Sequence, residues 1–337
     1  IPEGFASMSH RSDSTVDDKR AHKVNMRESR FLYGHPVDVA GTGFTVLDRV
    51  YADGDLADET LGGSCGNILV SLAMLHRRVA PVLALGDDDA GERLVHEFAQ
   101  AGASVRYIAR RGDLRSPVLA QELDTASGQH GFSFVCPETR EILPRFQPIG
   151  EAELASALPM LSHCSIFYAD RLSDNILEAM RTASSAGAII FFEPSDIEEG
   201  NLFEEALQLA TILKYSEDRL GVRLADRLTN CLRIVTYGAA GLEVRDGVGA
   251  IWCKAIDAPK VLDTCGSGDM VSVGVIDWML TSSFGTGCLR AADLLEGIVA
   301  GQRLAAENCA YAGARGLFKK RGAQYVRKLL SIRSTVP

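Results

Sequence analysis

Strand-like and helix-like segments alternate along most of the chain, and this alternation limits the possible fold more than any other feature of the sequence. Apolar runs such as Ile166 to Tyr168 and Ala188 to Phe192 predict buried strands, and segments such as Ser173 to Ser185 have the apolar spacing of a helix. This order predicts an α/β protein with a doubly wound, mostly parallel sheet and helices on both of its faces.

Two parts of the chain depart from this alternation, near residues 45–61 and 116–136. Strand-like segments there are separated by turn-forming residues, which is typical of hairpins. We expect them to form a small antiparallel β lid attached to the main body. Val79 to Leu85 and Ser104 to Ile108 are each expected to form one strand.

The composition excludes some classes of partner. The 337 residues carry a formal net charge of −9, whereas nucleic acids and anionic membrane surfaces require a cationic face. No apolar run reaches the length of a membrane span.

None of the eight cysteines forms a C-x-x-C pair, so we expect buried thiols in a reducing, cytoplasmic environment. Residues 1–33 lack apolar periodicity and are expected to be a flexible tail, partly an expression scar, before one folded domain over residues 34–330.

The run Asp263-Thr264-Cys265-Gly266-Ser267-Gly268-Asp269 carries the clearest chemical signal. It stands directly before an apolar helix, so the backbone N–H groups of Gly266, Ser267 and Gly268 are expected to point into one concavity that suits a transferring phosphoryl group. Asp269, in the first helical turn, would face the same concavity and accept a proton from an attacking hydroxyl, or orient it. A glycine-rich turn with a capping Asp is equally common as a purely structural element.

A second glycine-containing segment precedes another apolar helix. Gly62 and Gly63 allow the backbone to approach a ligand closely, although on their own they are explained better by a simple turn, and Asn67 offers both a donor and an acceptor to a hydroxyl. Asp48, in an otherwise apolar stretch, is a further candidate for binding sugar hydroxyls, although an exposed strand position explains it equally well. Arg171 follows a predicted strand and would contact the acceptor or the transferred phosphate, with a surface salt bridge as the alternative.

Thr236, Gly238 and Gly241 lie where a predicted strand passes into a loop. Open α/β sheets bind ligands at the carboxyl ends of their strands, so a nucleotide contact is one interpretation and a simple strand-turn-strand connection is the other. No G-x-x-x-x-G-K-[ST] run occurs, which excludes a Walker-type ATPase.

In this order, the segments resemble the ribokinase-like (PfkB-type) carbohydrate kinase family from Val37 to Gly322. The two signature regions are Gly62 to Gly86 and Asp263 to Ile276. The resemblance implies a ribokinase-like sheet with a β lid, ATP and Mg²⁺ as cofactors and a small-molecule sugar as acceptor, and it leaves the need for a monovalent cation open. It implies transfer of the γ-phosphoryl group to a hydroxymethyl group, with a nucleoside as the alternative acceptor.

The resemblance also implies roles for individual residues. Asp269 is similar to the catalytic base of the family, and Gly266 to Gly268 are similar to its anion hole. The positions similar to acceptor-binding residues are Asp48, Gly62, Gly63 and Asn67. The positions similar to nucleotide-binding residues are Thr236, Gly238 and Gly241, together with Asn308 and Ala312 at a helix end beside the adenine.

One segment departs from the family pattern. The family often has an Asn-x-x-Glu motif that organises magnesium and phosphates, but Ser216 and Arg219 stand at its two ends here. Glu193 or Glu217 would then take over the metal, through water. The departure also favours an alternative in which the protein is a catalytically weak sugar-binding or regulatory member of the family.

Two remaining expectations concern a different enzyme class and the oligomeric state. A nicotinamide oxidoreductase is an interpretation that rests on Gly41 and Gly43 alone, because the third glycine of the dinucleotide fingerprint is missing. The unpaired edges and apolar face of the predicted lid favour a homodimer formed through it.

Overall fold

The main sheet is mostly parallel, as the sequence predicts. The computed structural model describes residues 37–52, 54–123, 130–197, 200–224, 231–282 and 289–332, so the predicted tail over residues 1–33 lies outside the described residues. In spatial order, the described strands of this sheet are β14 (Ala250–Lys254), β13 (Gly241–Arg245), β12 (Leu232–Thr236), β11 (Ile212–Ser216), β10 (Ile189–Phe192), β9 (Ile166–Ala169), β1 (Val39–Thr42) and β4 (Val79–Pro81). All neighbours from β12 to β4 are parallel, whereas β13 and β14 pair in antiparallel fashion at one edge.

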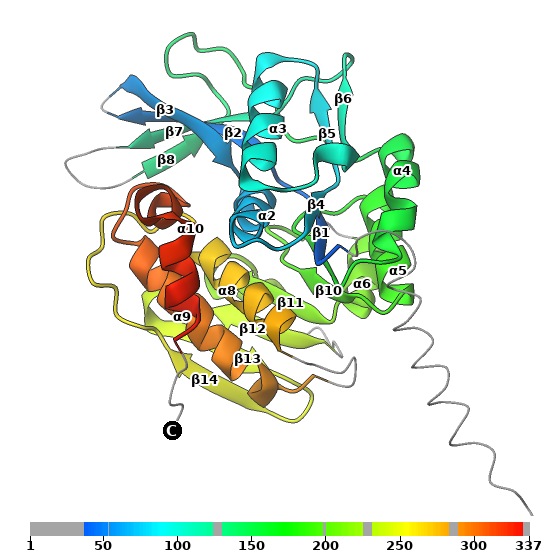
Figure 1. Ribbon diagram of the computed structural model, residues 1–337, viewed down its shortest axis with the longest axis vertical. Coiled ribbons are helices and arrows are strands. Elements are labelled where there is room, and N and C mark those ends of the chain that lie inside the picture. Colours follow the sequence, from blue (N-terminus) through cyan, green and yellow to red (C-terminus); the bar gives the residue numbers. More distant parts are fainter. Residues whose placement is uncertain are drawn as a thin grey trace, which may run out of the picture. The chain divides into compact units, whose positions relative to one another are not determined.

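Helices cover both faces of this sheet, which confirms the predicted fold class (Figure 1). The described helices are α2 (Ser64–Met74), α3 (Asp89–Ala101), α4 (Glu151–Leu161), α5 (Asp174–Ser185), α6 (Asn201–Leu209), α7 (Val222–Leu224), α8 (Ser267–Thr281), α9 (Leu295–Asn308) and α10 (Gly316–Leu330). The clusters of buried side chains place α2, α8, α9 and α10 on one face and α4, α5 and α6 on the other. Among the described helices, none is both long and apolar enough to cross a membrane.

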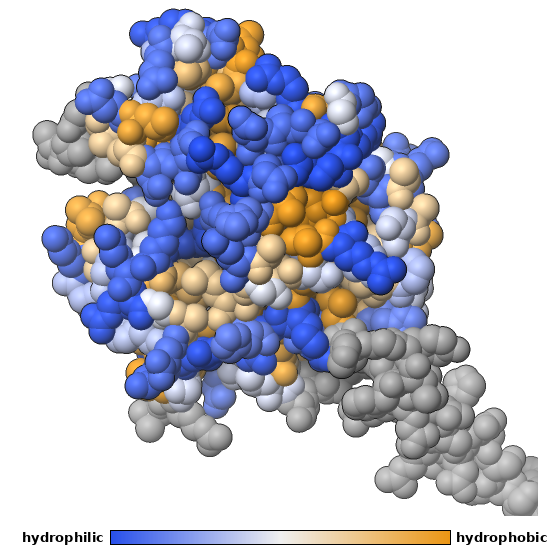
Figure 2. Space-filling model, turned by 45° about the horizontal axis from the view of Figure 1, so that its top comes forward, coloured by the Kyte–Doolittle hydropathy of each residue, from blue (hydrophilic) through white to orange (hydrophobic). Residues whose placement is uncertain are grey.

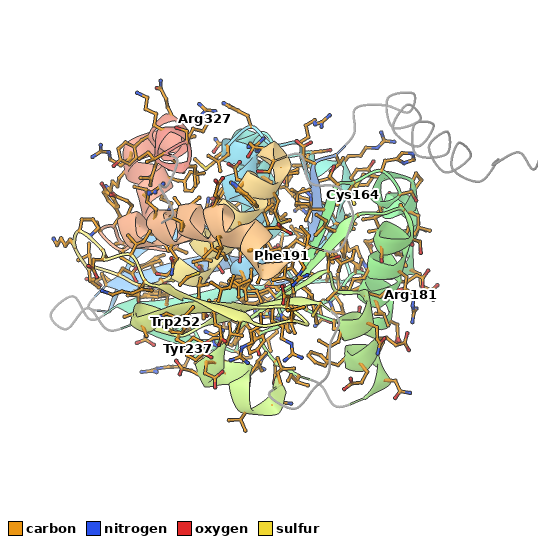
Figure 3. The ribbon with its side chains drawn as sticks, turned by 90° about the horizontal axis from the view of Figure 1, so that it is seen from below. Cys164, Arg181, Phe191, Tyr237, Trp252 and Arg327 are labelled. Carbon is orange, nitrogen blue, oxygen red and sulfur yellow. The ribbon has the colours of Figure 1, made fainter. Side chains whose placement is uncertain are left out.

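Apolar side chains gather in two buried clusters rather than on the surface. Neighbouring strand residues point to opposite faces of a sheet, so Phe191 joins the cluster under α8 and Phe192 joins the cluster under α5. The face shown in Figure 2 is mostly hydrophilic, with apolar residues in separate areas. In Figure 3, Phe191 lies in the interior, whereas Arg181 and Arg327 reach outward. Burial of such a side chain contributes about 1.5–3 kcal/mol, which fixes the helices against the strands.

The predicted lid is present as a separate four-stranded sheet. Its strands, in spatial order, are β3 (Asp55–Gly62), β2 (Val46–Ala52), β7 (Val118–Leu123) and β8 (His130–Ser133). The two hairpins, β2–β3 and β7–β8, are antiparallel as predicted, and a parallel pairing of β2 with β7 joins them. Because β2 follows β1 and β3 leads into α2, the lid continues directly from the main sheet.

Two strand predictions were wrong in their boundaries. Val79 to Leu85 is not one strand, because β4 ends at Pro81 and a second strand, β5 (Leu83–Gly86), belongs to another sheet. Proline has no N–H to donate, which suits β4 as the edge strand of the main sheet, with no further strand beyond it among the described residues. Ser104 to Ile108 forms a short 3₁₀ turn, Val105–Tyr107, and only then begins β6 (Ile108–Arg111), which pairs with β5.

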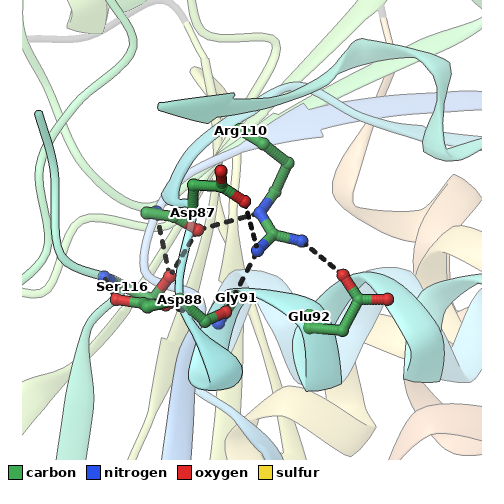
Figure 4. A network of polar contacts seen from close by, with 7 residues as sticks. Asp87, Asp88, Gly91, Glu92, Arg110 and Ser116 are labelled. Carbon is green, nitrogen blue, oxygen red and sulfur yellow. Dashed lines mark hydrogen bonds and ion pairs between the residues drawn. The ribbon is translucent and has the colours of Figure 1, made fainter. Parts of the chain in front are cut away.

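The start of α3 is tied to the lid by a network of polar contacts (Figure 4). The Asp88 carboxylate accepts from the Gly91 N–H at 2.8 Å, which caps the helix, and from the Ser116 N–H at 2.8 Å, just before β7. The Arg110 guanidinium donates to the Gly86 carbonyl and to Glu92. The base of the second hairpin is therefore fixed to the body of the protein.

Candidate active site

The candidate residues lie along one edge of the main sheet. The parallel strands β1, β9, β10, β11 and β12 all run in the same direction, so their carboxyl ends share this edge. The residues that follow these ends are Gly43, Asp170, Glu193, Glu217 and Tyr237. Open α/β sheets bind ligands at this position, because the loops that leave the strands diverge there.

Helix α8 begins at the edge with a tightly braced turn. Gly266 has φ 71°, and a Cβ on it would lie 2.5 Å from the Cβ of Ala314, so this position requires glycine. The carboxylate of Asp263 accepts from the Cys265 N–H at 2.8 Å and from the Gly313 N–H at 2.7 Å. Asp263 thus braces the turn and is not the residue that faces a substrate.

The turn leaves a small group of amides for an anion. The Ser267 N–H donates to the Thr264 carbonyl at 3.2 Å, and the Ser267 hydroxyl donates to the same oxygen at 2.8 Å. The following N–H groups, those of Gly268 and Asp269, belong to the first turn, where a helix supplies no acceptor. Of the three positions predicted for the anion hole, Ser267 donates within the turn, and Gly268 lies in the first helical turn, where amides suit an anion, so anion binding by this turn stays a prediction.

Asp269 lies in the first turn of α8 and is buried. Its Oδ2 accepts from the Nδ2 of Asn67 at 2.8 Å, so the starts of α2 and α8 meet at this carboxylate. Burial, with a further contribution from the nearby Glu193 carboxylate, raises the pKa of Asp269 to about 6. A carboxylate with this pKa is a better proton acceptor near neutral pH than an ordinary Asp.

Two buried oxygens beside Asp269 have no hydrogen-bond partner in the described part of the chain. They are Oδ1 of Asp48, on β2, and Oδ1 of Asn67, on α2. Buried polar atoms are nearly always hydrogen-bonded, so this pair marks a place for donors from a ligand. Gly62 makes room for the carboxylate, because a Cβ on it would lie 1.8 Å from Oδ2 of Asp48. Burial raises the pKa of Asp48 to about 7.

The neighbouring Asp170 was missed by the sequence analysis. This fully buried carboxylate follows β9 and accepts from the Phe44 N–H at 2.7 Å and from the Cys65 N–H at 3.3 Å. Burial raises its pKa to about 7. It ties the chain after β1 to the start of α2, where Gly63 approaches the carbonyl of Phe44. Its position directly after an apolar strand, next to Arg171, was the available signal.

Arg171 and Gly43 have local roles around Asp170. The guanidinium of Arg171 lies 4.6 Å from the centre of the Phe44 ring and donates to the Asp170 carbonyl at 2.9 Å. A Cβ on Gly43 would lie 1.8 Å from Oδ1 of Asp170, and one on Gly41 would lie 3.0 Å from the Leu69 side chain, so packing explains both glycines without a dinucleotide. The predicted contact of Arg171 with an acceptor stays a prediction.

The two carboxylates predicted to hold a metal do not fit a shared metal site. Glu193 forms an ion pair with Lys214, and it also accepts from the Ser272 hydroxyl at 2.6 Å and from the Tyr168 hydroxyl at 3.4 Å. Glu217 instead turns back over Gly221. No group of three metal-binding side chains occurs among the described residues. Because the oxygens of Glu193 are engaged and Glu217 lies against Gly221, these two carboxylates offer no shared set of ligands for magnesium.

The predicted nucleotide-binding residues lie at the end of β12. The Thr236 hydroxyl donates to the Tyr215 carbonyl at 3.4 Å. Gly238 has φ 57° with open space beside it, whereas a Cβ on Gly241 would lie 2.3 Å from the Cys253 carbonyl oxygen. The ring of Tyr237 packs 5.3 Å from that of Trp252, centre to centre, and Figure 3 shows the two side by side. Gly241 is therefore required by its close contact with the neighbouring strand, whereas Gly238 borders open space in which a ligand could lie.

Asn308, at the end of α9, holds the loop that follows it. Its Oδ1 accepts from the Leu317 N–H at 3.0 Å, and its Nδ2 donates to the Ala314 carbonyl at 3.2 Å. Ala312 is exposed on this loop. The same loop packs against Gly266, so Asn308 supports the anion-binding turn from behind.

A glycine-containing helix start beside a buried carboxylate, on a doubly wound α/β fold, suits phosphoryl transfer. Residues 57–320, well over half of the chain, match the family described as pfkB family carbohydrate kinase. The chain therefore belongs to this family, and as a carbohydrate kinase it is a phosphotransferase with an alcohol group as acceptor.

Known proteins support the same assignment at low identity. Over 238 residues the chain is 26% identical to a fructokinase of Klebsiella pneumoniae, which covers 64% of this chain and 75% of the relative. Over 240 residues it is 28% identical to an aminoimidazole riboside kinase of Salmonella typhimurium, with 64% and 72% covered. The structure of a fructokinase with bound ATP from Xylella fastidiosa shares the fold, with a TM-score of 0.71, 20% identity and coverage of 88% and 99%.

Proposed function

We propose that the protein is a cytoplasmic, ATP-dependent kinase that transfers the γ-phosphoryl group to a hydroxymethyl group of a small sugar. The hydrogen bond between Asn67 and Asp269 is the main support for this proposal, because it places the proposed acceptor-binding residues next to the proposed phosphoryl-binding turn. On one side lie the unpartnered oxygens of Asp48 and Asn67, which suit the hydroxyls of a polyol. On the other side lies the Gly268 amide, which suits a phosphoryl oxygen.

In this mechanism each residue has a distinct task. Asp48 and Asn67 accept hydrogen bonds from acceptor hydroxyls and so orient the hydroxymethyl group. Asp269 takes its proton as the oxygen attacks the γ-phosphorus and the bond to the β-phosphate oxygen breaks, leaving ADP. The amides at the start of α8 stabilise the charge on the transferring group. Thr236, Gly238 and Ala312 line the proposed position of the nucleotide, and requirements for Mg²⁺ and a monovalent cation stay predictions.

An acceptor panel tests this function. We expect ADP formation with a sugar that carries a hydroxymethyl group, fructose and ribose included, and little with nucleosides such as aminoimidazole riboside. Asp48→Asn should raise the KM for that sugar about 10–100-fold, because a charged acceptor of hydroxyl hydrogen bonds is lost, and should leave the KM for ATP unchanged. Asp89→Asn, an exposed position in the first turn of α3 and outside the lid strands, is the matched control.

The outcomes of the panel separate the alternatives. Faster turnover with nucleosides than with sugars would establish the nucleoside kinase. Sugar binding without ADP formation for any acceptor would contradict the catalytic proposal and support a regulatory member of the family. An unchanged sugar KM in Asp48→Asn would remove Asp48 from the acceptor site.

We also propose a homodimer through the lid. Within the described residues, β3 and β8 are the outer strands of the lid, and Leu56 and Phe132 on them are 43% and 53% exposed. Open strand edges with apolar side chains favour pairing with a second copy. Light scattering should give about twice the chain mass of 36.3 kDa. A monomer at micromolar concentration, or a dimer that survives Leu56→Lys unchanged, would contradict this interface.

A further inference from the structure

A buried lysine lies beside the start of α8, where no role has been assigned to it. Lys214, on β11, is 2% exposed. Apart from the turn of helix itself, the Lys214 ammonium is the one group in the described chain within 4 Å of a Cβ placed on Gly268, at 3.6 Å. Among the described residues outside this turn, the Lys214 ammonium is therefore the only group that borders the space over the Gly268 backbone.

This ammonium is held in a fixed place by its counter-ion. Glu193 pairs with Lys214 through one oxygen, while its other oxygen accepts from Ser272, on α8, and from Tyr168, on β9. A largely buried ion pair such as this one, with Glu193 14% exposed, is seldom the most stable filling of a core, since apolar residues of similar size are often as good or better. Its retention beside free helix amides therefore indicates a ligand that uses the charge.

We propose that Lys214 is the cationic member of the anion site and binds the terminal phosphates of the nucleotide. This rests on the proposed function, and it accounts for the departure at Ser216 and Arg219, because a lysine on the same strand supplies positive charge there. The Gly268 N–H would donate a directional hydrogen bond to a phosphate oxygen, and the Lys214 ammonium would neutralise part of the phosphate charge. Together these two contacts suit a polyphosphate. Glu193 is a positioning residue that keeps the ammonium under Gly268 when no nucleotide is bound.

Calorimetric binding of two nucleotides tests the proposal directly. We expect Lys214→Met to weaken binding of the non-hydrolysable triphosphate adenylyl imidodiphosphate by about tenfold or more, because a charge-assisted contact is lost. Binding of AMP, which lacks the terminal phosphates, should change less than about twofold. Lys214→Arg should restore most of the preference for the triphosphate. Lys328→Met, exposed on α10, is the control and should change neither affinity.

A double variant controls for loss of stability, because Lys214→Met alone leaves the charge of Glu193 without its counter-ion and could destabilise the protein. Lys214→Met combined with Glu193→Gln removes both charges with little change of shape, and it should show the same selective loss. Equal weakening for AMP and the triphosphate, or no weakening for either in the double variant, would overturn the proposal. If the wild type binds the triphosphate through Lys214 but phosphorylates no acceptor, the proposed function fails while the assignment of Lys214 holds.

Discussion

Replacing Asp269 with Asn is expected to lower kcat by about 10²–10⁴-fold, the usual loss when a positioned general base is removed. The amide keeps the shape of the side chain but cannot take the proton of the hydroxymethyl group. Affinity for adenylyl imidodiphosphate should be unchanged or slightly improved, because a negative charge near the terminal phosphate is gone. Asp89→Asn, an exposed position in the first turn of α3, is the matched control and should keep full activity.

The wild-type pH profile gives an independent check on the same residue. Burial raises the pKa of Asp269 to about 6, so the carboxylate is ionised and able to accept a proton above that pH and is neutral below it. The value of kcat/KM should therefore fall as the pH drops through about 7 and then about 6, where Asp48 and then Asp269 take up protons, and the residual activity of Asp269→Asn should lack the lower step. A variant that keeps turnover within about threefold of the wild type would refute the mechanism, since a lost general base has a far larger effect.

Gly266→Ala is expected to have the largest effect on stability and to abolish activity with it. The positive φ of 71° is unfavourable for alanine, and the new Cβ would lie 2.5 Å from the Cβ and 2.6 Å from the Cα of Ala314. Backbone strain and overpacking together predict a loss of roughly 2–5 kcal/mol in the free energy of unfolding. If the loop moves instead, the turn that holds the Gly268 amide is displaced and phosphoryl transfer is lost.

A substitution at a second glycine distinguishes the effect of backbone strain from the effect of steric crowding. Gly102, after α3, has a φ of 91° and nothing within 4 Å of its Cβ position, so Gly102→Ala should cost only about 1–2 kcal/mol and leave kcat intact. Denaturant unfolding of both variants measures the difference. Equal destabilisation of the two proteins would show that contact with Ala314 does not constrain the anion-binding turn.

Local patterns predicted most of the fold and the two helix starts of the site. The strand-helix alternation was sufficient for the parallel sheet, and the glycine-rich run before Asp269 marked the start of α8 because its special backbone is encoded by adjacent residues. The predicted strand from Val79 to Leu85 failed because periodicity cannot show that a chain changes sheets. Pro81 was the local signal, since proline within a strand is typical of a sheet edge.

The missed residues owe their positions to contacts between distant segments. Asp170 binds the N–H of Phe44, which is 126 positions earlier in the chain, and Lys214 lies beside Gly268 only because β11 and α8 meet in the fold. A sequence shows neither contact. The available signal was chemical: a lysine inside a run expected to be buried needs a partner, and Glu193, at the end of the preceding strand, was a suitable one.

The bracing of the α8 turn by the loop after α9 has a consequence for the order in which the protein acquires activity during synthesis. The lid and the two unpartnered oxygens of Asp48 and Asn67 come from the first two-fifths of the chain, so they emerge early from the ribosome. The N–H of Gly313 and the backbone of Ala314, which hold the turn before Asp269, emerge almost last. A chain that ends before Gly313 therefore carries Asp48 and Asn67 without the brace of the α8 turn. It also lacks Leu317 and Phe318 of the buried core, so we expect no phosphoryl transfer until the last helix has been made.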